Sequence, residues 1–386
     1  MLAARNIDVP ASEIRKIYNK IIGRKDVFDL TVGIPDFDTP EHIKDAAKKA
    51  IDEGFTTYTH NAGYIDVREA LAQKLKRDNN IDANPVNELI CTAGGMGALV
   101  LANMILIDPG DEVIYPDPGF VSHYAHIKLA DGVPVSIQLK KENGFGLLAE
   151  DIEKKITSKT KALVLNSPNN PTGGVTSNKE LKKIADLCIE KDIYVIADEA
   201  YEKFRYDTEN PLFIGSLPDM KERTISIFSL SKTYAMTGWR IAVATGSSEL
   251  VGAMTKLQEH LIAMPTSIAQ KAAGAAAVGP QDCVDEMLRT FRKRRDLITK
   301  GLNDIEGVEI DPPGGAFYAF PDVSAYGIKS YDLVHRLLEE TKVVTIHGTA
   351  FGQYGEGFLR LCYAVSTDKI NEALSRLDIY LPKLLH

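Results

Sequence analysis

The chain of 386 residues carries 45 Lys and Arg against 53 Asp and Glu, a formal net charge of −8 at pH 7. Apolar residues make up 44% and charged residues 25%, which is the composition of a soluble globular protein and excludes a disordered or collagen-like chain. The acidic balance disfavours a nucleic-acid partner. At roughly 150 residues per domain, the length predicts two or three domains.

The N-terminal residues contain no apolar segment of signal-peptide length, so we expect a cytoplasmic protein. The longest uncharged stretch, residues 89–107, contains several glycines together with Thr92 and Asn103. It predicts a strand, a tight turn and a helix, and we expect no membrane span. The four cysteines are widely separated in apolar surroundings, which indicates buried free thiols in a reducing compartment.

Short apolar segments rich in Val and Ile alternate with segments of helical periodicity. The predicted strands cover residues 89–92, 112–115, 133–137, 162–165, 193–197, 224–228 and 241–244. They show little polar alternation, which is typical of strands covered on both faces. This order predicts an α/β fold whose large domain has a seven-stranded, mostly parallel sheet between helices.

The pattern changes near residue 280, where the elements indicate a smaller α+β unit. Its predicted elements are helices over residues 282–303, 331–340 and 367–383 and a strand over residues 358–364. An amphipathic helix over residues 12–22 precedes the large sheet, and we expect it to pack on this unit. We therefore predict a large domain over residues 31–284 and a small domain formed by residues 1–30 and 285–386.

The most specific segment is SLSKTYAMTGWR, residues 229–240, directly after an apolar strand. Seen alone, Lys232 is either a partly exposed loop lysine or a desolvated amine with a lowered pKa, which can form a Schiff base. Arg240 opens the next strand. Its guanidinium suits either a structural ion pair or bidentate binding of a phosphate.

Two further polar segments follow apolar strands. Asp198, in ADEAY, stands where ligands bind in parallel α/β sheets, so its carboxylate can cap a helix, bind a metal or pair with a cationic ring nitrogen. No His/Cys cluster with metal-ligand spacing accompanies it, and we expect no metal site. Asn170, in the rigid loop NSPNNPTGG, is either a turn residue or a hydrogen-bond donor to a ligand.

The glycine-rich segment TAGGMG, residues 92–97, joins a strand to a helix. Such a turn can present backbone N–H groups and a helix N-terminus to a phosphate. No Gly-Lys-Ser/Thr follows it, so it is not a P-loop. It also lacks the GxGxxG pattern, which disfavours a dinucleotide.

Together these segments resemble the pyridoxal-phosphate-dependent aminotransferases of class I and II, which have the aspartate aminotransferase fold, or fold type I. The resemblance extends from TVGIPDFDTP at residues 31–40 to FLRL at residues 358–361. The resemblance rests on the order in which NSPNNPTGG, ADEAY and SLSKTYAMTGWR follow one another along the chain. The segment ASEIRK at residues 11–16 looks more like the archaeal aromatic or broad-specificity members.

The resemblance implies a role for each residue of the site. Lys232 would form the Schiff base with pyridoxal 5′-phosphate, Asp198 would keep the pyridine nitrogen protonated, and Tyr201 and Asn170 would bind the phenolic oxygen. The residues implied to hold the ring and the phosphate are Phe120, the backbone of Gly95 and Met96, Ser229, Ser231, Arg240 and, from the neighbouring subunit of a homodimer, Tyr58. The residues implied to bind the substrate are Arg360, at the α-carboxylate, Asn166 and the backbone of Gly33.

The implied reaction moves the amino group of an L-amino acid to a 2-oxo acid, with 2-oxoglutarate as the expected acceptor, by a ping-pong mechanism. Some aspartate aminotransferases that resemble this chain carry, at the position of Met96, a lysine that meets the distal carboxylate of the substrate. We therefore expect no strict preference for dicarboxylates. Both aspartate and aromatic amino acids therefore remain candidate amino donors.

Other functions remain possible on the same fold. A lyase of the C–S β-lyase type, a racemase-like enzyme or a cyclase would use the same lysine, and product analysis separates them from an aminotransferase. A ligand-sensing module is a more distant alternative, because aminotransferase-like domains occur fused to DNA-binding domains. The residues before Thr31 are too few for a helix-turn-helix domain.

Overall fold

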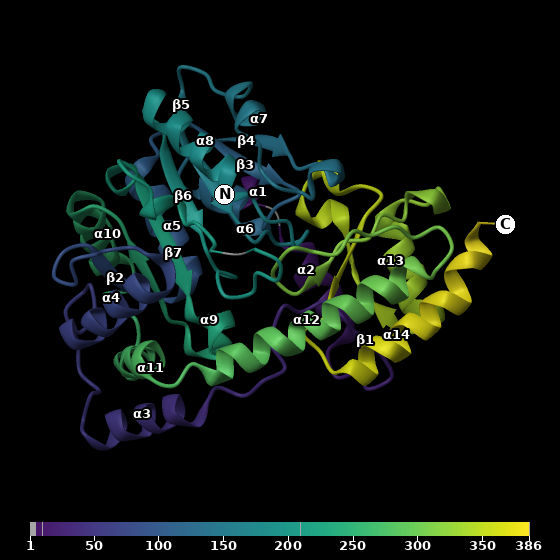
Figure 1. The fold of residues 1–386 in the computed structure, drawn as a ribbon, viewed down its shortest axis with the longest axis horizontal. Helices are drawn as coiled ribbons and strands as arrows, with labels where there is room; N and C mark the ends of the chain where they lie inside the picture. The colour runs from purple at the N-terminus through teal and green to yellow at the C-terminus, as the bar shows by residue number, and fades with distance from the viewer. Residues whose placement is uncertain (1–4, 10, 209, 386) are drawn as a thin grey trace.

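The computed structural model describes residues 5–9, 11–208 and 210–385, and it has two parts that meet along one side of the larger one (Figure 1). Residues 1–4, 10 and 386, which belong to the predicted small domain, lie outside the described residues. The larger part is built on a seven-stranded sheet, and the smaller part on a three-stranded antiparallel sheet.

The large sheet has the strand order β2-β8-β7-β6-β5-β3-β4. Its strands are β2 (Leu89–Thr92), β3 (Glu112–Asp117), β4 (Val133–Gln138), β5 (Thr160–Asn166), β6 (Tyr194–Asp198), β7 (Thr224–Ser229) and β8 (Ala242–Thr245). β8 runs antiparallel to both of its neighbours, and the remaining pairs are parallel. The predicted mostly parallel sheet is therefore confirmed, and its strands begin and end within about two residues of the predicted positions.

Helices cover both faces of this sheet, and β5 shows why its sequence is continuously apolar. Ala162 and Val164 belong to the buried cluster that includes residues of α5 (Gly94–Leu106) and α10 (Ser248–Leu261). Leu163 and Leu165 belong to the cluster formed with α8 (Asn178–Glu190) on the opposite face. Because successive strand residues point to opposite faces, both sets are removed from water.

The remaining helices of the larger part lie around this sheet. They are α3 (Glu41–Asp52), α4 (Ile65–Asn79), α6 (Val121–Leu129), α7 (Ala149–Glu153), α9 (Leu230–Thr233) and α11 (Ser267–Val278). α3, α4 and α11 contribute buried apolar side chains to a third cluster, which also contains Phe228 and Val243 of the sheet. This packing fixes the ends of β7 and β8, from which the chain enters α9 and α10.

The smaller part contains β9 (Tyr318–Ala319), β11 (Ile346–His347), β12 (Leu359–Cys362), α13 (Ser330–Thr341) and α14 (Thr367–Tyr380). A short parallel pair, β1 (Phe28–Asp29) with β10 (Val343–Val344), lies beside them. The long helix α12 (Asp282–Asn303) runs from the larger part into the smaller one (Figure 1). These elements agree with the predicted α+β unit.

Two helices precede the large sheet, α1 (Arg5–Asp8) and α2 (Glu13–Ile21). The side chain of Ser12 caps α2 by accepting a hydrogen bond from the backbone N–H of Arg15. Ile17 and Ile21 of α2 are buried in the same cluster as Leu337 of α13 and Leu377 of α14. α2 therefore packs on the smaller part as predicted, whereas the domain boundaries at residues 31 and 285 stay a prediction.

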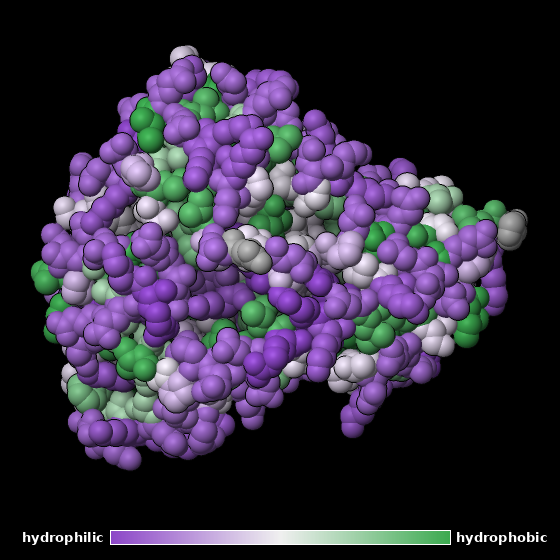
Figure 2. Space-filling view, in the orientation of Figure 1, coloured by the Kyte–Doolittle hydropathy of each residue, from purple (hydrophilic) through white to green (hydrophobic). Residues whose placement is uncertain are grey.

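The surface seen in Figure 2 is mostly polar, and its apolar residues are scattered over several small areas. Across the described ranges, no helix has both the length and the apolar character that crossing a bilayer requires. In the same ranges, no three His, Cys, Asp or Glu side chains gather into a group that could hold a metal ion. The four cysteines are free as predicted, and Cys91, Cys188 and Cys362 are buried, whereas Cys283, near the start of α12, is only partly buried, contrary to the prediction.

Candidate active site

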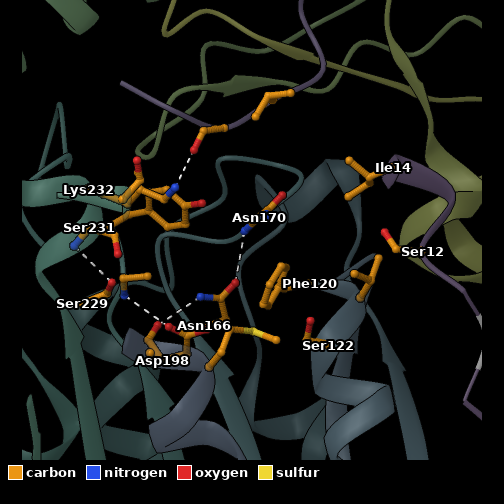
Figure 3. A pocket seen from close by; sticks show the side chains of 18 of the residues that line it. Ser12, Ile14, Phe120, Ser122, Asn166, Asn170, Asp198, Ser229, Ser231 and Lys232 are labelled. Carbon is orange, nitrogen blue, oxygen red and sulfur yellow. Dashed lines mark hydrogen bonds between the residues drawn. The ribbon is translucent and has the colours of Figure 1, made fainter. Parts of the chain in front are cut away.

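A cavity of about 440 Å³ lies at the carboxyl ends of the central strands. Asn166, Asp198 and Ser229, the last residues of β5, β6 and β7, line it. Side chains of the smaller part and of the segment around α2 complete its wall, so that groups from distant parts of the chain face one space (Figure 3). This is the position at which ligands bind in parallel α/β sheets.

The parallel register of β5 and β6 sets the spacing of the polar groups at the sheet edge. Asn166 lies beside Asp198 in this register, and its Nδ2 donates a hydrogen bond of 3.0 Å to the Asp198 backbone carbonyl. The Asn166 Oδ1 accepts a hydrogen bond of 3.1 Å from the Asn170 backbone N–H. Asn166 thus ties the loop that carries Asn170 to the strand that carries Asp198 (Figure 3).

The carboxylate of Asp198 is buried and forms a hydrogen bond with the side chain of His123. Its Oδ2 lies 3.1 Å from Nε2 of His123, and its Oδ1 accepts a hydrogen bond of 3.2 Å from the backbone N–H of Ala200. The ring of His123 also packs edge-on against Phe120, with 5.5 Å between the ring centroids. His123 is missing from the sequence prediction, although its place in a helix three residues after Phe120 puts both side chains on one face.

Lys232 lies in α9, directly beyond the end of β7. Ser229 caps this short helix, because its Oγ accepts a hydrogen bond of 3.3 Å from the Ser231 backbone N–H. The Nζ of Lys232 donates a hydrogen bond to the Gly33 carbonyl. Burial lowers the pKa of Lys232 from its usual 10.5 to about 8, and the positive charges of Arg240 and Arg360 favour the same direction. A much larger fraction of this amine is therefore neutral near pH 8 than in an exposed lysine.

The turn between β2 and α5 forms another corner of the cavity. Gly94 has a φ of +70°, and a Cβ at this position would lie 2.3 Å from Nη2 of Arg240, so a side chain here would collide with the guanidinium. No side chain caps the N-terminus of α5. Gly95, Ser229, Ser231 and Arg240 line the cavity at this corner, where helix N–H groups, hydroxyls and a cation suit an anion.

Arg360 of β12 is a buried cation, with 2% of its surface exposed. Its Nη1 donates a hydrogen bond of 3.0 Å to Oδ1 of Asn170, and its Nη2 donates to the Thr31 carbonyl. Its guanidinium lies 4.6 Å from the ring centroid of Tyr318 and 4.7 Å from that of Phe351. Its Nε has no hydrogen-bond partner, and among the described residues no carboxylate forms an ion pair with it. A buried guanidinium whose charge is not balanced by a carboxylate of the protein is suited to binding the carboxylate of a ligand.

Two tyrosines, Tyr201 and Tyr318, also line the cavity. The hydroxyls of Tyr201 and Tyr318 are 2.8 Å apart and share a hydrogen bond. Burial raises the pKa of Tyr201 well above its usual value, so its phenol stays protonated and can donate a hydrogen bond. Tyr318 was not predicted, because its segment in the smaller part carries no motif of its own.

The cavity brings together the residues that the sequence predicts this chain to contribute to its own site, whereas Tyr58 is predicted to act on the neighbouring subunit. The predicted residues that line it are Gly33, Gly95, Met96, Phe120, Asn166, Asn170, Asp198, Tyr201, Ser229, Ser231, Lys232, Arg240 and Arg360. Tyr58 lies outside this cavity, and 86% of its side chain is exposed. Ser12, Ile14, Arg15 and Tyr18 line the cavity without having been predicted.

The sequence and the fold were compared with known proteins. Residues 25–377 match the family "Aminotransferase class I and II". The chain is 42% identical over 372 residues to an aspartate aminotransferase of Pyrococcus abyssi, covering 96% of this chain and 95% of that protein. It is 40% identical over 372 residues to the aromatic-amino-acid aminotransferase 2 of Thermococcus litoralis, with the same coverage of both chains.

The fold agrees with that of a solved structure over almost the whole length. The aspartate aminotransferase of Rhizobium meliloti superimposes with a TM-score of 0.94 at 36% identity, covering 99% of each chain. The similarity in sequence and the similarity in structure thus point to the same group of proteins. They confirm the resemblance carried by the motifs, and this chain belongs to the class I and II aminotransferases, with the type I fold.

Proposed function

We propose that this aminotransferase uses pyridoxal 5′-phosphate to move the amino group of aspartate or an aromatic L-amino acid to a 2-oxo acid, with 2-oxoglutarate as acceptor. The observation that carries the proposal is the lining of one cavity, where the amine of Lys232, the carboxylate of Asp198 and the guanidinium of Arg360 face the same space. The family indicates the reaction type. The three side chains offer the groups that this reaction needs, namely a base, a partner for the ring nitrogen and a cation for the substrate carboxylate.

The lining of the cavity fits this cofactor. The corner formed by Gly95, Ser229, Ser231 and Arg240 suits a phosphate, as its hydroxyls and cation converge beside the uncapped N-terminus of α5. Asp198, held by His123, supplies a carboxylate for a protonated pyridine nitrogen. When bound, the cofactor supplies an electron sink for the charge that develops at the substrate Cα.

The side chains of the protein then have separate tasks. Arg360 binds the α-carboxylate of the substrate and orients its Cα toward Lys232. The neutral Nζ of Lys232 takes the proton from Cα, which its lowered pKa allows near neutral pH. Tyr201 and Asn170 would donate hydrogen bonds to the phenolic oxygen of the bound cofactor, and Phe120 would pack against its ring. Donor and acceptor both need Arg360, so they bind in turn and the kinetics are ping-pong.

A lyase of the C–S type is the second candidate on this fold. Product analysis with a single amino donor and 2-oxoglutarate separates the two candidates. Transfer yields one glutamate for each new 2-oxo acid, whereas a lyase releases ammonia and needs no acceptor. A ligand-sensing module is disfavoured, because sensing alone does not require a lysine with a lowered pKa, such as Lys232, in the same cavity as the unpaired guanidinium of Arg360.

The proposal includes a cytoplasmic homodimer with shared active sites. Tyr58 supports it, because this aromatic side chain is 86% exposed and lies away from the cavity of its own chain. In a dimer it would reach the phosphate corner of the second subunit. The four free cysteines are in keeping with a reducing compartment.

The first prediction concerns the lysine. Borohydride reduction of the holoenzyme, followed by peptide mapping, should place the cofactor on Lys232. In the apoenzyme, acylation of Lys232 by a small amine-reactive acylating agent should increase with pH, with a midpoint near pH 8. Burial lowers the pKa of Lys232, and the neutral amine, which is the reactive form, predominates above that pKa. Exposed lysines in the same digest serve as the internal control. A cofactor adduct on another lysine would refute the assignment.

The second prediction concerns the shared site. We expect Tyr58→Phe and Lys232→Ala each to lower activity as homodimers, because the first loses a bond to the phosphate and the second loses the base. If Tyr58 acts on the other subunit, an isolated heterodimer of the two variants contains one intact site and recovers about half of the wild-type turnover. Turnover no higher than half that of the Tyr58→Phe homodimer would place Tyr58 in its own site.

The third prediction concerns specificity. Arg360→Lys should lower kcat/KM for all donors by a similar factor, because every substrate carries an α-carboxylate and an ammonium cannot reproduce the guanidinium fork. Met96, 40% exposed and in the first turn of α5, offers no charge to a substrate side chain. Met96→Lys should raise kcat/KM for aspartate relative to phenylalanine. The ratio of the two donors measures the effect, and an unchanged ratio would contradict the role of this position.

A further inference from the structure

The N-terminal helix α2 contributes a wall of the cavity that no motif predicts. Its buried residues Ile17 and Ile21 anchor it on the smaller part. Ile14, Arg15 and Tyr18 line the cavity. Figure 3 shows Ser12 and Ile14 on the side of Phe120 and Ser122, across the cavity from Lys232. A substrate side chain that extends away from Lys232 would approach this wall.

Arg15 is the charged residue on this wall, and its charge is not neutralised by the protein. The next residue, Lys16, pairs with Glu13 at 2.6 Å, and Arg24 pairs with Asp26 at 2.6 Å. The guanidinium of Arg15 has no carboxylate partner among the described residues, and it lies 5.8 Å from the centroid of the Tyr18 ring. Tyr18 lines the cavity as well, so the Arg15 guanidinium lies next to a residue of the cavity wall.

The other three cations of the cavity already have tasks in the proposed function. Lys232 is the base, Arg240 stands at the phosphate corner and Arg360 meets the α-carboxylate. A dicarboxylic substrate brings a second carboxylate, which Met96 cannot pair with. Arg15 is the remaining cation among the described residues that line the cavity.

We propose that Arg15 binds the distal carboxylate of dicarboxylic substrates, namely aspartate, glutamate and their 2-oxo acids. This assignment rests on the proposed aminotransferase function and names the residue that reads the substrate side chain. Arg15 is exposed to solvent, so its attraction for a carboxylate is moderated by water and salt. The neighbouring Ile14, Tyr18 and Phe120 offer apolar surface, which lets aromatic donors bind without this charge.

The test compares Arg15→Gln with the wild-type holoenzyme in half-reactions with glutamate and with phenylalanine. We expect kcat/KM for glutamate to fall about tenfold, since a hydrogen-bonded charge pair is lost, and kcat/KM for phenylalanine to stay within about twofold. Binding of the unreactive dicarboxylate succinate should weaken by a similar factor, while binding of 3-phenylpropionate should not change. Arg15→Lys should recover part of the loss because it keeps the charge.

Lys16→Gln is the matched control, because it removes a positive charge from the next position of the same helix, where Glu13 already neutralises it. It should leave both donors and both inhibitors unchanged. An equal effect of Arg15→Gln on glutamate and phenylalanine, or the same selective loss in Lys16→Gln, would overturn the assignment while leaving the aminotransferase function intact. Wild-type enzyme that transfers no amino group to or from any dicarboxylate would refute both this inference and the proposed acceptor.

Discussion

The structure depends on an imbalance of charge in one cavity. Lys232, Arg240, Arg360 and Arg15 line it, and Asp198 is the one acidic residue among its described lining residues. Asp198 is hydrogen-bonded to His123, and a single carboxylate cannot neutralise four cations. Cations held close together in a partly desolvated space favour anionic ligands and disfavour further positive charge. The same field that attracts phosphate and carboxylates also helps to keep the amine of Lys232 neutral.

Two features of the fold position these groups, namely the common edge at which the parallel strands end and the contact between the larger and the smaller part. The parallel strands β5, β6 and β7 end at one edge and thereby align Asn166, Asp198 and Ser229. Arg360 comes from the smaller part and is joined to the larger one by its hydrogen bond of 3.0 Å to Asn170. The proposed binding site for the α-carboxylate is therefore assembled across both parts, so their relative position would determine how a substrate is held near Lys232.

Much of this arrangement could be predicted from the sequence, and the exceptions have a common cause. The strands were predictable because both of their faces are buried, as Leu163 and Val164 illustrate on opposite sides of β5. The residues within compact motifs, such as Lys232, were predictable from the sequence, and they line the cavity. His123, Tyr318 and Arg15 were missed because they belong to segments without a distinctive motif, and only the packing of distant elements brings them to the site. Tyr58, predicted to act on the neighbouring subunit, lies outside the cavity of its own chain, and its role stays a prediction.

The central claim is that the neutral amine of Lys232 moves the proton of the substrate Cα. The most direct test follows exchange of the Cα hydrogen of phenylalanine for deuterium in deuterated water, with the 2-oxo acid omitted. We expect Lys232→Ala to retain binding of the cofactor and of phenylalanine but to lose at least about a hundredfold in exchange rate, the usual contribution of a general base. Exchange in Lys232→Ala at a rate close to that of the wild type would contradict the account.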